Sequence, residues 1–130
     1  MKTLSRRGPE KSKNLRGLQN RLRRLRRSEV EYLVKFLGSS SALSSLLKVD
    51  RSSVSRWERG TFEPRGTERI DALLLVLNKL SRVYMPEVAS QWLEGINTYV
   101  GNQRPIDLIR RGRFSEVMAA LEQADTLAYA

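Results

Sequence analysis

The sequence contains neither cysteine nor histidine. Because cysteine is absent, the chain can form no disulfide and no thiolate metal site, and a reducing compartment is permitted. Because histidine is absent, the usual general base is missing, and only carboxylate, serine, lysine or tyrosine schemes remain for catalysis. We therefore expect a protein that is not an enzyme and that uses no cofactor and no metal.

Long apolar runs are also missing from the sequence. The longest, from Ala72 to Leu77, is far shorter than the roughly 20 residues that a membrane-spanning helix needs. The basic N-terminus is not followed by the apolar stretch of a secretory signal. These absences predict a cytoplasmic protein with no membrane partner.

Positive charge, by contrast, is abundant and unevenly distributed. The chain has 24 Lys and Arg against 14 Asp and Glu, a net charge of +10. Residues 1–27 hold 11 of these basic residues and one acid, whereas residues 28–130 hold 13 residues of each sign. Such an excess favours polyanionic partners such as nucleic acid. The surplus belongs to an N-terminal arm.

The arm itself shows two patterns. Residues 1–14 are polar and aperiodic, which is typical of a disordered tail. Four leucines then recur at steps of three and four, as on one face of an Arg-rich helix: Leu15, Leu18, Leu22 and Leu25. The arm is either a solvated, disordered or partly helical tail or a segment that follows DNA phosphates. Membrane-surface binding ranks third, because no bulky aromatic residue anchors the apolar face.

The rest of the chain is expected to be all-helical. Ser28 and Glu31 match a capping box, which should begin a helix that ends at Gly38. A long core helix is expected from about Thr67, and Pro86 suits the first turn of the next one. The remaining elements are a turn over 95–104, a short helix from Pro105, and a last helix capped by Ser115 that ends near Ala124.

Residues 39–60 have the pattern of a helix-turn-helix. Ser39 can cap a first short helix, and Asp50 can cap a second, in which Val54 and Trp57 face inward. A helix of this kind fits the DNA major groove, where arginine can donate two hydrogen bonds to guanine. The residues expected on its outer face are Arg51, Ser52, Ser55, Arg56 and Arg59.

The run from Val49 to Pro64 contains Val-Asp-Arg-Ser-Ser-Val-Ser-Arg-Trp-Glu-Arg-Gly and resembles the Xre/Cro-type repressor pattern. The resemblance implies that the helix from Asp50 enters the major groove of operator DNA. It also implies that Ser39 and Ser40 approach phosphates. Lys48 stands where such proteins have a glycine at the turn, and a left-handed conformation there costs a lysine about 1 kcal/mol.

The C-terminal half carries a second pattern, formed by Trp92, Leu93, Asn97, Gly101, Arg104 to Ile109, Gly112, Val117 and Leu121. Its spacing resembles the C-terminal domain of the MbcA/ParS/Xre antitoxin family, whose members neutralise RES-domain toxins that destroy NAD. The resemblance implies an all-α, compact helical bundle that contains the helix-turn-helix and a C-terminal helical antitoxin domain. The expected division is a basic N-terminal arm at 1–27, a DNA-binding domain at 28–82 and a toxin-binding domain at 83–130.

A partner surface is expected near the C-terminus. Arginines gather around Gly112, and a free apolar tail carrying Tyr129 could enter another protein's cleft. Alternatively, the arginines complement a helix dipole and Tyr129 packs on the core. The residues expected at the toxin are Arg104, Arg110, Arg111, Arg113, Leu127, Tyr129 and Ala130. Four others are expected in the core rather than at the partner: Trp92, Ile106, Leu108 and Ile109.

Together these patterns predict an antitoxin of a type II toxin–antitoxin system. Its partners would be a cognate RES-domain toxin, operator DNA and a second copy of itself, in a homodimer and in a hetero-oligomer with the toxin. Two alternatives stay open. One is a stand-alone helix-turn-helix transcriptional repressor without a toxin partner, and the other is a protein inhibitor whose helix-turn-helix no longer reads DNA.

Overall fold

The computed structural model describes the backbone of residues 2–128 and the side chains of residues 15–127. The described chain is all-α, as predicted. Its elements are α1 (Lys2–Leu37), α2 (Ser40–Leu47), α3 (Arg51–Glu58), α4 (Pro64–Val83), α5 (Pro86–Glu94), the 3₁₀ helix η1 (Thr98–Val100), α6 (Pro105–Arg110) and α7 (Phe114–Ala128). In this part of the chain, extended pairing is limited to one isolated bridge between Asn97 and Gln103.

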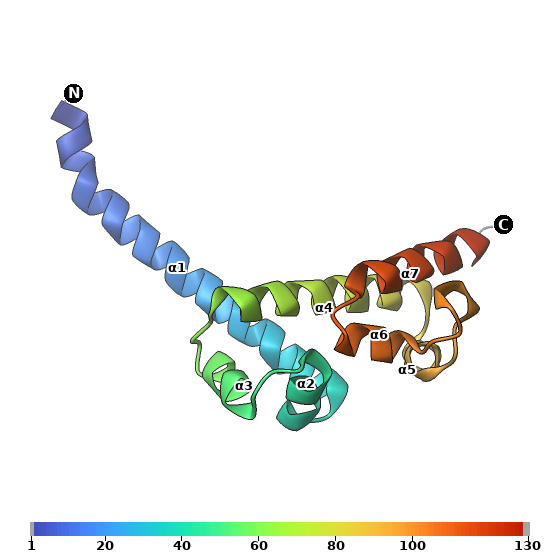
Figure 1. Ribbon diagram of the computed structural model, residues 1–130. Helices are drawn as coiled ribbons and strands as arrows, with labels where there is room; N and C mark the ends of the chain where they lie inside the picture. The colour runs from blue at the N-terminus through green and yellow to red at the C-terminus, as the bar shows by residue number, and fades with distance from the viewer. Residues whose placement is uncertain (1, 129–130) are drawn as a thin grey trace.

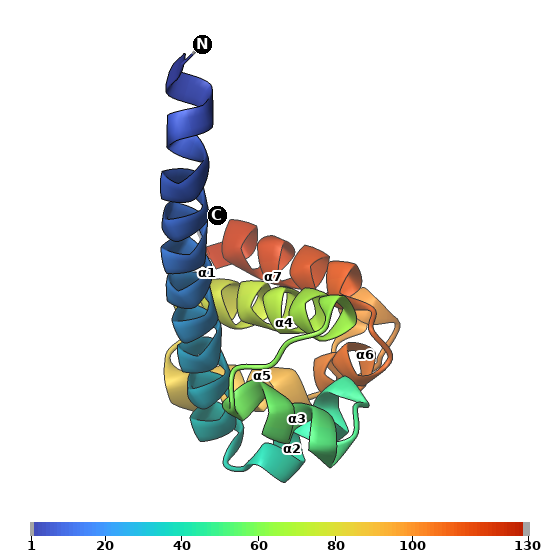
Figure 2. The same ribbon diagram turned by 90° about the vertical axis from the view of Figure 1, so that its left-hand side faces the viewer.

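The helices pack around one hydrophobic core. The C-terminal part of α1 lies against α2, α3 and α4, while α7 runs along α4 and α6. In Figures 1 and 2 the N-terminal part of α1 projects well beyond this body, on the side away from α2 and α3. The core contains residues from every α-helix, including Val30, Leu43, Trp57, Leu93 and Leu121. The helices α2 and α3 and the C-terminal half therefore share a single core.

The start of the first helix differs from the prediction. α1 begins at Lys2, and Ser28 lies inside it, where its hydroxyl donates to the backbone oxygen of Arg24 at 3.1 Å. A serine inside a helix can bond a carbonyl one turn back instead of capping. The predicted capping box at Ser28 and Glu31 was therefore wrong. The arginines and leucines that precede Ser28 are good helix formers, which lets the helix continue through it.

Prolines mark three helix starts. Pro86 and Pro105 occupy the first turns of α5 and α6, as predicted. Pro64 does the same for α4, which therefore begins three residues before the expected Thr67. A proline is tolerated in a first turn because its missing N–H would be unpaired there anyway.

The last helix is longer than predicted. α7 begins at Phe114 rather than after a Ser115 cap, and it continues to Ala128. The hydroxyl of Thr126 donates to the carbonyl of Glu122 at 2.9 Å inside this helix. The expected free tail was therefore wrong for Thr126 and Leu127. The predicted contacts Tyr129 and Ala130 lie outside the described residues.

The helices of the described chain are too short or too polar to span a bilayer. None of them combines the length and the apolar character that such a crossing requires.

Candidate functional site

α2 and α3 are two short helices joined by a tight turn, at the positions where the sequence predicted a helix-turn-helix. The Ser39 hydroxyl oxygen accepts the Ala42 N–H at 3.0 Å and so caps α2, as predicted. Lys48, at the turn, has φ 53° and ψ 50°, which is the left-handed conformation expected of it. The Val49 N–H then donates to the Ser44 carbonyl at 3.0 Å and closes the turn.

A side chain from α4 stabilises this turn. The guanidinium of Arg69 donates to the carbonyls of Leu47 and Lys48, at 2.9 and 3.3 Å. Carbonyls at a helix C-terminus have no partner within the helix, so an arginine that reaches them offsets part of the strain at Lys48. Arg69 was not predicted from the sequence, because its distance along the chain gives no indication of this contact.

The inner side of the motif is fully buried. Leu43, Val54 and Trp57 have no exposed surface, as the sequence pattern predicted. The Trp57 indole N–H donates to the Glu63 carboxylate, with 3.2 Å between Nε1 and Oε1. This bond satisfies a polar group that would otherwise be costly to bury. Trp57 therefore positions α3 against α4.

The outer side of α3 is open to solvent. Arg51, Ser52, Ser55 and Arg59 are exposed, and their spacing places them on one face of the helix. Arg56 is half-buried and donates to the Ser53 hydroxyl at 3.0 Å. The structure thus brings four of the five predicted residues together on the exposed face of α3. Arg56 lies to the side of this face, where its guanidinium bonds Ser53.

The start of α3 differs from the expectation in one detail. Asp50 occupies the N-cap position, and its backbone carbonyl accepts the Ser53 N–H at 2.9 Å. Among the described residues, no backbone N–H donates to the Asp50 side chain. The predicted side-chain cap was therefore wrong, although the helix begins where it was expected to begin.

The two serines expected at phosphates have structural partners. Ser39 caps α2, and the Ser40 hydroxyl donates to Oε1 of Glu58 at the far end of α3, at 3.0 Å. This bond ties the start of α2 to the end of α3. Both serines lie at the N-terminus of α2, where backbone N–H groups could still receive a phosphate.

A basic hollow beside α3 was not foreseen. It lies between α1 and the segment after α3, and Arg23, Arg26 and Arg59 line it together with 60–62. Arg27 borders the same region and donates to the Glu58 carbonyl at 3.1 Å. The sequence showed the arginines but could not place α1 beside the end of α3.

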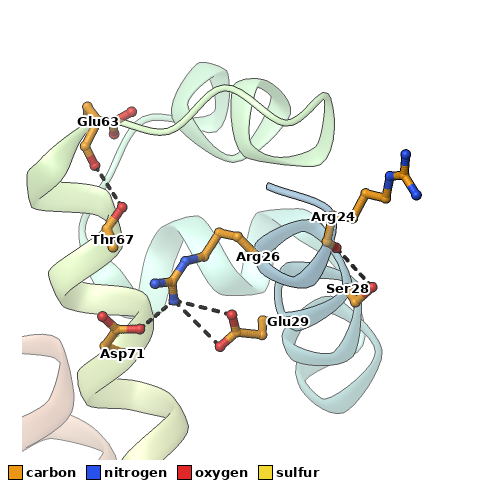
Figure 3. A network of polar contacts seen from close by, with 7 residues as sticks. All are labelled: Arg24, Arg26, Ser28, Glu29, Glu63, Thr67 and Asp71. Atoms are coloured by element: carbon orange, nitrogen blue, oxygen red, sulfur yellow. Dashed lines mark hydrogen bonds and ion pairs between the residues drawn. The ribbon is translucent and has the colours of Figure 1, made fainter. Parts of the chain in front are cut away.

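An ion-pair network links α1 to α4 (Figure 3). The Arg26 guanidinium of α1 pairs with Asp71 of α4, and Glu29 lies 3.4 Å from the same nitrogen. Partial burial raises the pKa of Glu29, against the lowering effect of Arg26. The basic N-terminal segment is thus attached to the body through charged residues of both signs.

The C-terminal arginines also have intrachain partners. Asp107 accepts from Arg104 at 2.9 Å and from Arg110 at 3.1 Å. The hydrogen bond from Arg104 holds the pKa of the Asp107 carboxyl below its usual range. Arg111 donates to Gln103 at 2.7 Å, and Arg113 to Glu116 at 2.8 Å. These four predicted toxin contacts lie together around α6, and each has a polar neighbour.

Leu127 lies apart from those arginines. It is 14 residues after Arg113 along α7, which is about 21 Å at 1.5 Å per residue. Leu127 and Tyr99 are 65% and 54% exposed and line one surface hollow, together with Ala119, Gln123 and Thr126. The exposed apolar pair of Tyr99 and Leu127 is a candidate partner contact, of which only Leu127 was predicted from the sequence.

Four apolar residues of this half were assigned to the core. Leu108 and Ile109 are buried, whereas Trp92 and Ile106 are half-buried and pack against the core. The assignment is therefore confirmed, fully for the first pair and in part for the second.

Comparison with known proteins gives relatives of one kind. No model of a known protein family matches the chain. The chain is 28% identical to a protein of Mycobacterium tuberculosis described as a probable mycobacterial cidal antitoxin, Rv3188, over 73% of this chain and 84% of that protein. It is 29% identical to the mycobacterial cidal antitoxin MbcA of Mycobacterium bovis, over 54% of this chain but only 64% of MbcA.

A solved structure has the same fold. The crystal structure of the M. tuberculosis MbcT–MbcA toxin–antitoxin complex contains a chain that superposes with a TM-score of 0.62, at 24% identity, over 77% of this chain and 93% of that one. The family expected from the two motifs is thus the family that the comparisons find. The chain is homologous to the mycobacterial cidal antitoxins MbcA and Rv3188.

Proposed function

We propose that this protein is an antitoxin that binds a cognate toxin through its C-terminal helices and reads operator DNA with α3. The observation that carries the proposal is its homology to proteins named as antitoxins. The related solved structure is that of a toxin–antitoxin complex. A chain with this fold and this ancestry is expected to have the same kind of partner.

The toxin partner is proposed to be a RES-domain enzyme that degrades NAD. This proposal rests on the resemblance of residues 92–121 to the C-terminal domain of the MbcA/ParS/Xre antitoxin family. The surface features that would contact the toxin are the arginines around α6 and the apolar pair of Tyr99 and Leu127. Exposed aromatic and arginine residues are the types most enriched among strong contacts between proteins.

DNA binding is proposed from the geometry of α3. Its exposed face carries Arg51, Ser52, Ser55 and Arg59, and its opposite face is fully buried in the core. A short helix with such a face can enter the major groove, and arginine can donate two hydrogen bonds to guanine there. Binding to the promoter of its own operon would make the antitoxin an autorepressor. Without a toxin, the same α3 geometry would make a stand-alone repressor.

Two measurements on the full chain test the proposal. Cells that express a candidate RES-domain toxin should lose NAD and stop growing. Co-expression of this chain should restore both and yield a complex that purifies intact. The purified chain should also shift DNA from upstream of its gene more strongly than a scrambled duplex. A DNA shift without rescue would favour the stand-alone repressor, and rescue without a shift would favour an inhibitor that no longer reads DNA.

A further inference from the structure

One face of α1 carries an apolar stripe that the body leaves uncovered. We define the α1 stripe as Leu15, Leu18, Leu22, Leu25, Glu29, Tyr32 and Phe36, which alternate in steps of three and four. Its six apolar side chains are each between 41% and 61% exposed. This is the heptad pattern of helices that pair with one another. Because α1 continues through Ser28, the stripe spans three heptads rather than the four leucines alone.

The stripe lies where an apolar surface is expected to bind a partner. The N-terminal part of α1 projects beyond the body in both views (Figures 1 and 2). A projecting helix without tertiary contacts is marginal in water, and large exposed apolar patches mark interaction surfaces. Nearer the body, Leu25 and Tyr32 line a hollow with Leu74 and Asn78 of α4. The stripe is therefore continuous with an apolar groove between α1 and α4.

We propose that the α1 stripe binds the same stripe of a second copy of this chain, with the two helices antiparallel. The ends of the stripe, at 15 and 36, place its midpoint next to Leu25. A twofold axis there would bring Phe36 of one chain beside Leu15 of its partner, and Tyr32 beside Leu18. Such a contact closes on itself and uses the same surface of both chains.

Charge selects the antiparallel arrangement. Residues 15–27 contain six arginines and no acid, whereas residues 28–37 contain Glu29, Glu31 and one lysine. A parallel pair would place the two arginine-rich halves side by side, and like charges at such positions oppose pairing. An antiparallel pair instead places each arginine-rich half along the half of the other chain that carries Glu29 within the stripe. The inference concerns assembly of this chain alone and holds whether or not it binds DNA or a toxin.

Sedimentation of the full chain tests the interface. The wild-type chain should be a dimer at micromolar concentration. The double variant Leu18→Asn, Leu25→Asn should raise the dissociation constant of the dimer at least tenfold. Leu75→Asn is the matched control, because Leu75 of α4 lies outside the stripe and is 61% exposed, as is Leu25. A chain that is monomeric at 100 μM, or a dimer that the double variant leaves unchanged, would overturn the proposal.

Disulfide trapping tests the direction of the helices, since the chain has no cysteine of its own. Leu25→Cys should oxidise to a covalent dimer with itself. Leu15→Cys should not, because its two copies would lie about 30 Å apart, at 1.5 Å per residue from the axis. A mixture of Leu15→Cys and Phe36→Cys should form the mixed disulfide. Efficient dimerisation of Leu15→Cys alone would show a parallel pair and contradict the proposed arrangement.

The main rival occupant is an anionic membrane surface, since the stripe is flanked by arginines and includes Tyr32 and Phe36. Vesicles of phosphatidylserine and phosphatidylcholine, compared with phosphatidylcholine alone, separate the two cases. If the stripe binds a second copy, the wild-type chain should remain a dimer when vesicles are present. Leu25→Asn should then weaken the dimer. A monomer that binds the anionic vesicles, and that loses this binding with Leu25→Asn, would assign the stripe to the membrane.

Discussion

Gly66 lies directly against the ring of Trp57. A Cβ atom at Gly66 would lie 2.6 Å from Cζ2 of Trp57 and 2.8 Å from its Nε1. The same indole N–H donates to Glu63, in the segment that leads into α4. The first turn of α4 can therefore approach α3 this closely only because residue 66 has no side chain. This contact joins α3 to the core.

The first prediction follows from that contact. Gly66→Ala should lower the free energy of unfolding by about 1 to 3 kcal/mol, the usual cost of overpacking a core. Gly17→Ala is the matched control, because no described atom beyond its own neighbouring backbone lies within 4 Å of a Cβ there. Alanine is also the better helix former, so the control should be neutral or stabilising. Urea unfolding measures both, and equal stability of the two variants would contradict the tight contact.

The second prediction concerns the proposed contact of α3 with DNA. Arg51→Ala should weaken binding to the specific operator by about 1 to 3 kcal/mol, the range for one arginine that donates two bonds to guanine. Arg56→Ala should have a smaller effect, since that guanidinium also bonds Ser53. Arg82→Ala removes the same charge from the exposed C-terminal end of α4 and should leave binding unchanged. Gel-shift titration would contradict the assignment of α3 if all three variants bound equally.

The third prediction concerns the basic hollow between α1 and the end of α3. Arg23 and Arg59 both line it, close to the proposed DNA surface. Replacing both by glutamine should flatten the dependence of log K on log salt by about 0.9 for each DNA phosphate that the protein no longer neutralises. Arg16→Gln, on the projecting part of α1, is the comparison. An unchanged slope in the double variant would place the DNA away from this hollow.

Local patterns in the sequence were sufficient to predict much of this architecture. Proline starts, the Ser39 cap and the buried Trp57 each depend on residues within one or two turns, so their physical causes are visible in the sequence. Ser28 was misassigned because the same serine can either cap a helix or bond a carbonyl inside one, and the preceding residues decide which.

Contacts between segments that are far apart in the sequence could not be predicted from local patterns. Arg69 reaches the turn at Lys48 only because the fold brings the N-terminal half of α4 near the end of α2. Tyr99 and Leu127 line one hollow because η1 packs on α7. The α1 stripe was visible as four leucines, but its length followed only from the continuity of the helix. In each of these cases the contact or surface depends on how the helices pack or how far a helix continues, which a short stretch of sequence does not show.

The fourth prediction is a pH dependence. The hydrogen bond from Arg104 lowers the pKa of Asp107 in the folded chain below its ordinary 3.8. A lowered carboxyl pKa contributes stability above about pH 3.8, and this contribution is lost as the pH falls through the folded value. Asp107→Asn should therefore be less stable than wild type at pH 7, and the difference should shrink toward pH 3. Carbon-detected NMR titration should place the Asp107 carboxyl below 3.8, and a value at or above it would contradict the account.

The last prediction concerns the proposed toxin-binding surface. Truncation of the chain at Ala124 would also remove Asp125, whose carboxylate pairs with Lys79 of α4 at 2.8 Å, so a loss of rescue could reflect a weakened fold. Point substitutions on the exposed apolar pair avoid this problem.

The double variant Tyr99→Ala, Leu127→Ala should lose rescue of growth in cells that express the toxin. Each side chain is more than half exposed, so its removal leaves the core intact, and a buried aromatic anchor can contribute 2 kcal/mol or more to a protein interface. Met85→Ala, at a residue that is 72% exposed between α4 and α5, should still rescue. Arg111→Glu tests the arginines around α6 separately, since they lie about 20 Å from Leu127. Full rescue by both test variants would place the toxin contact on another face of the domain.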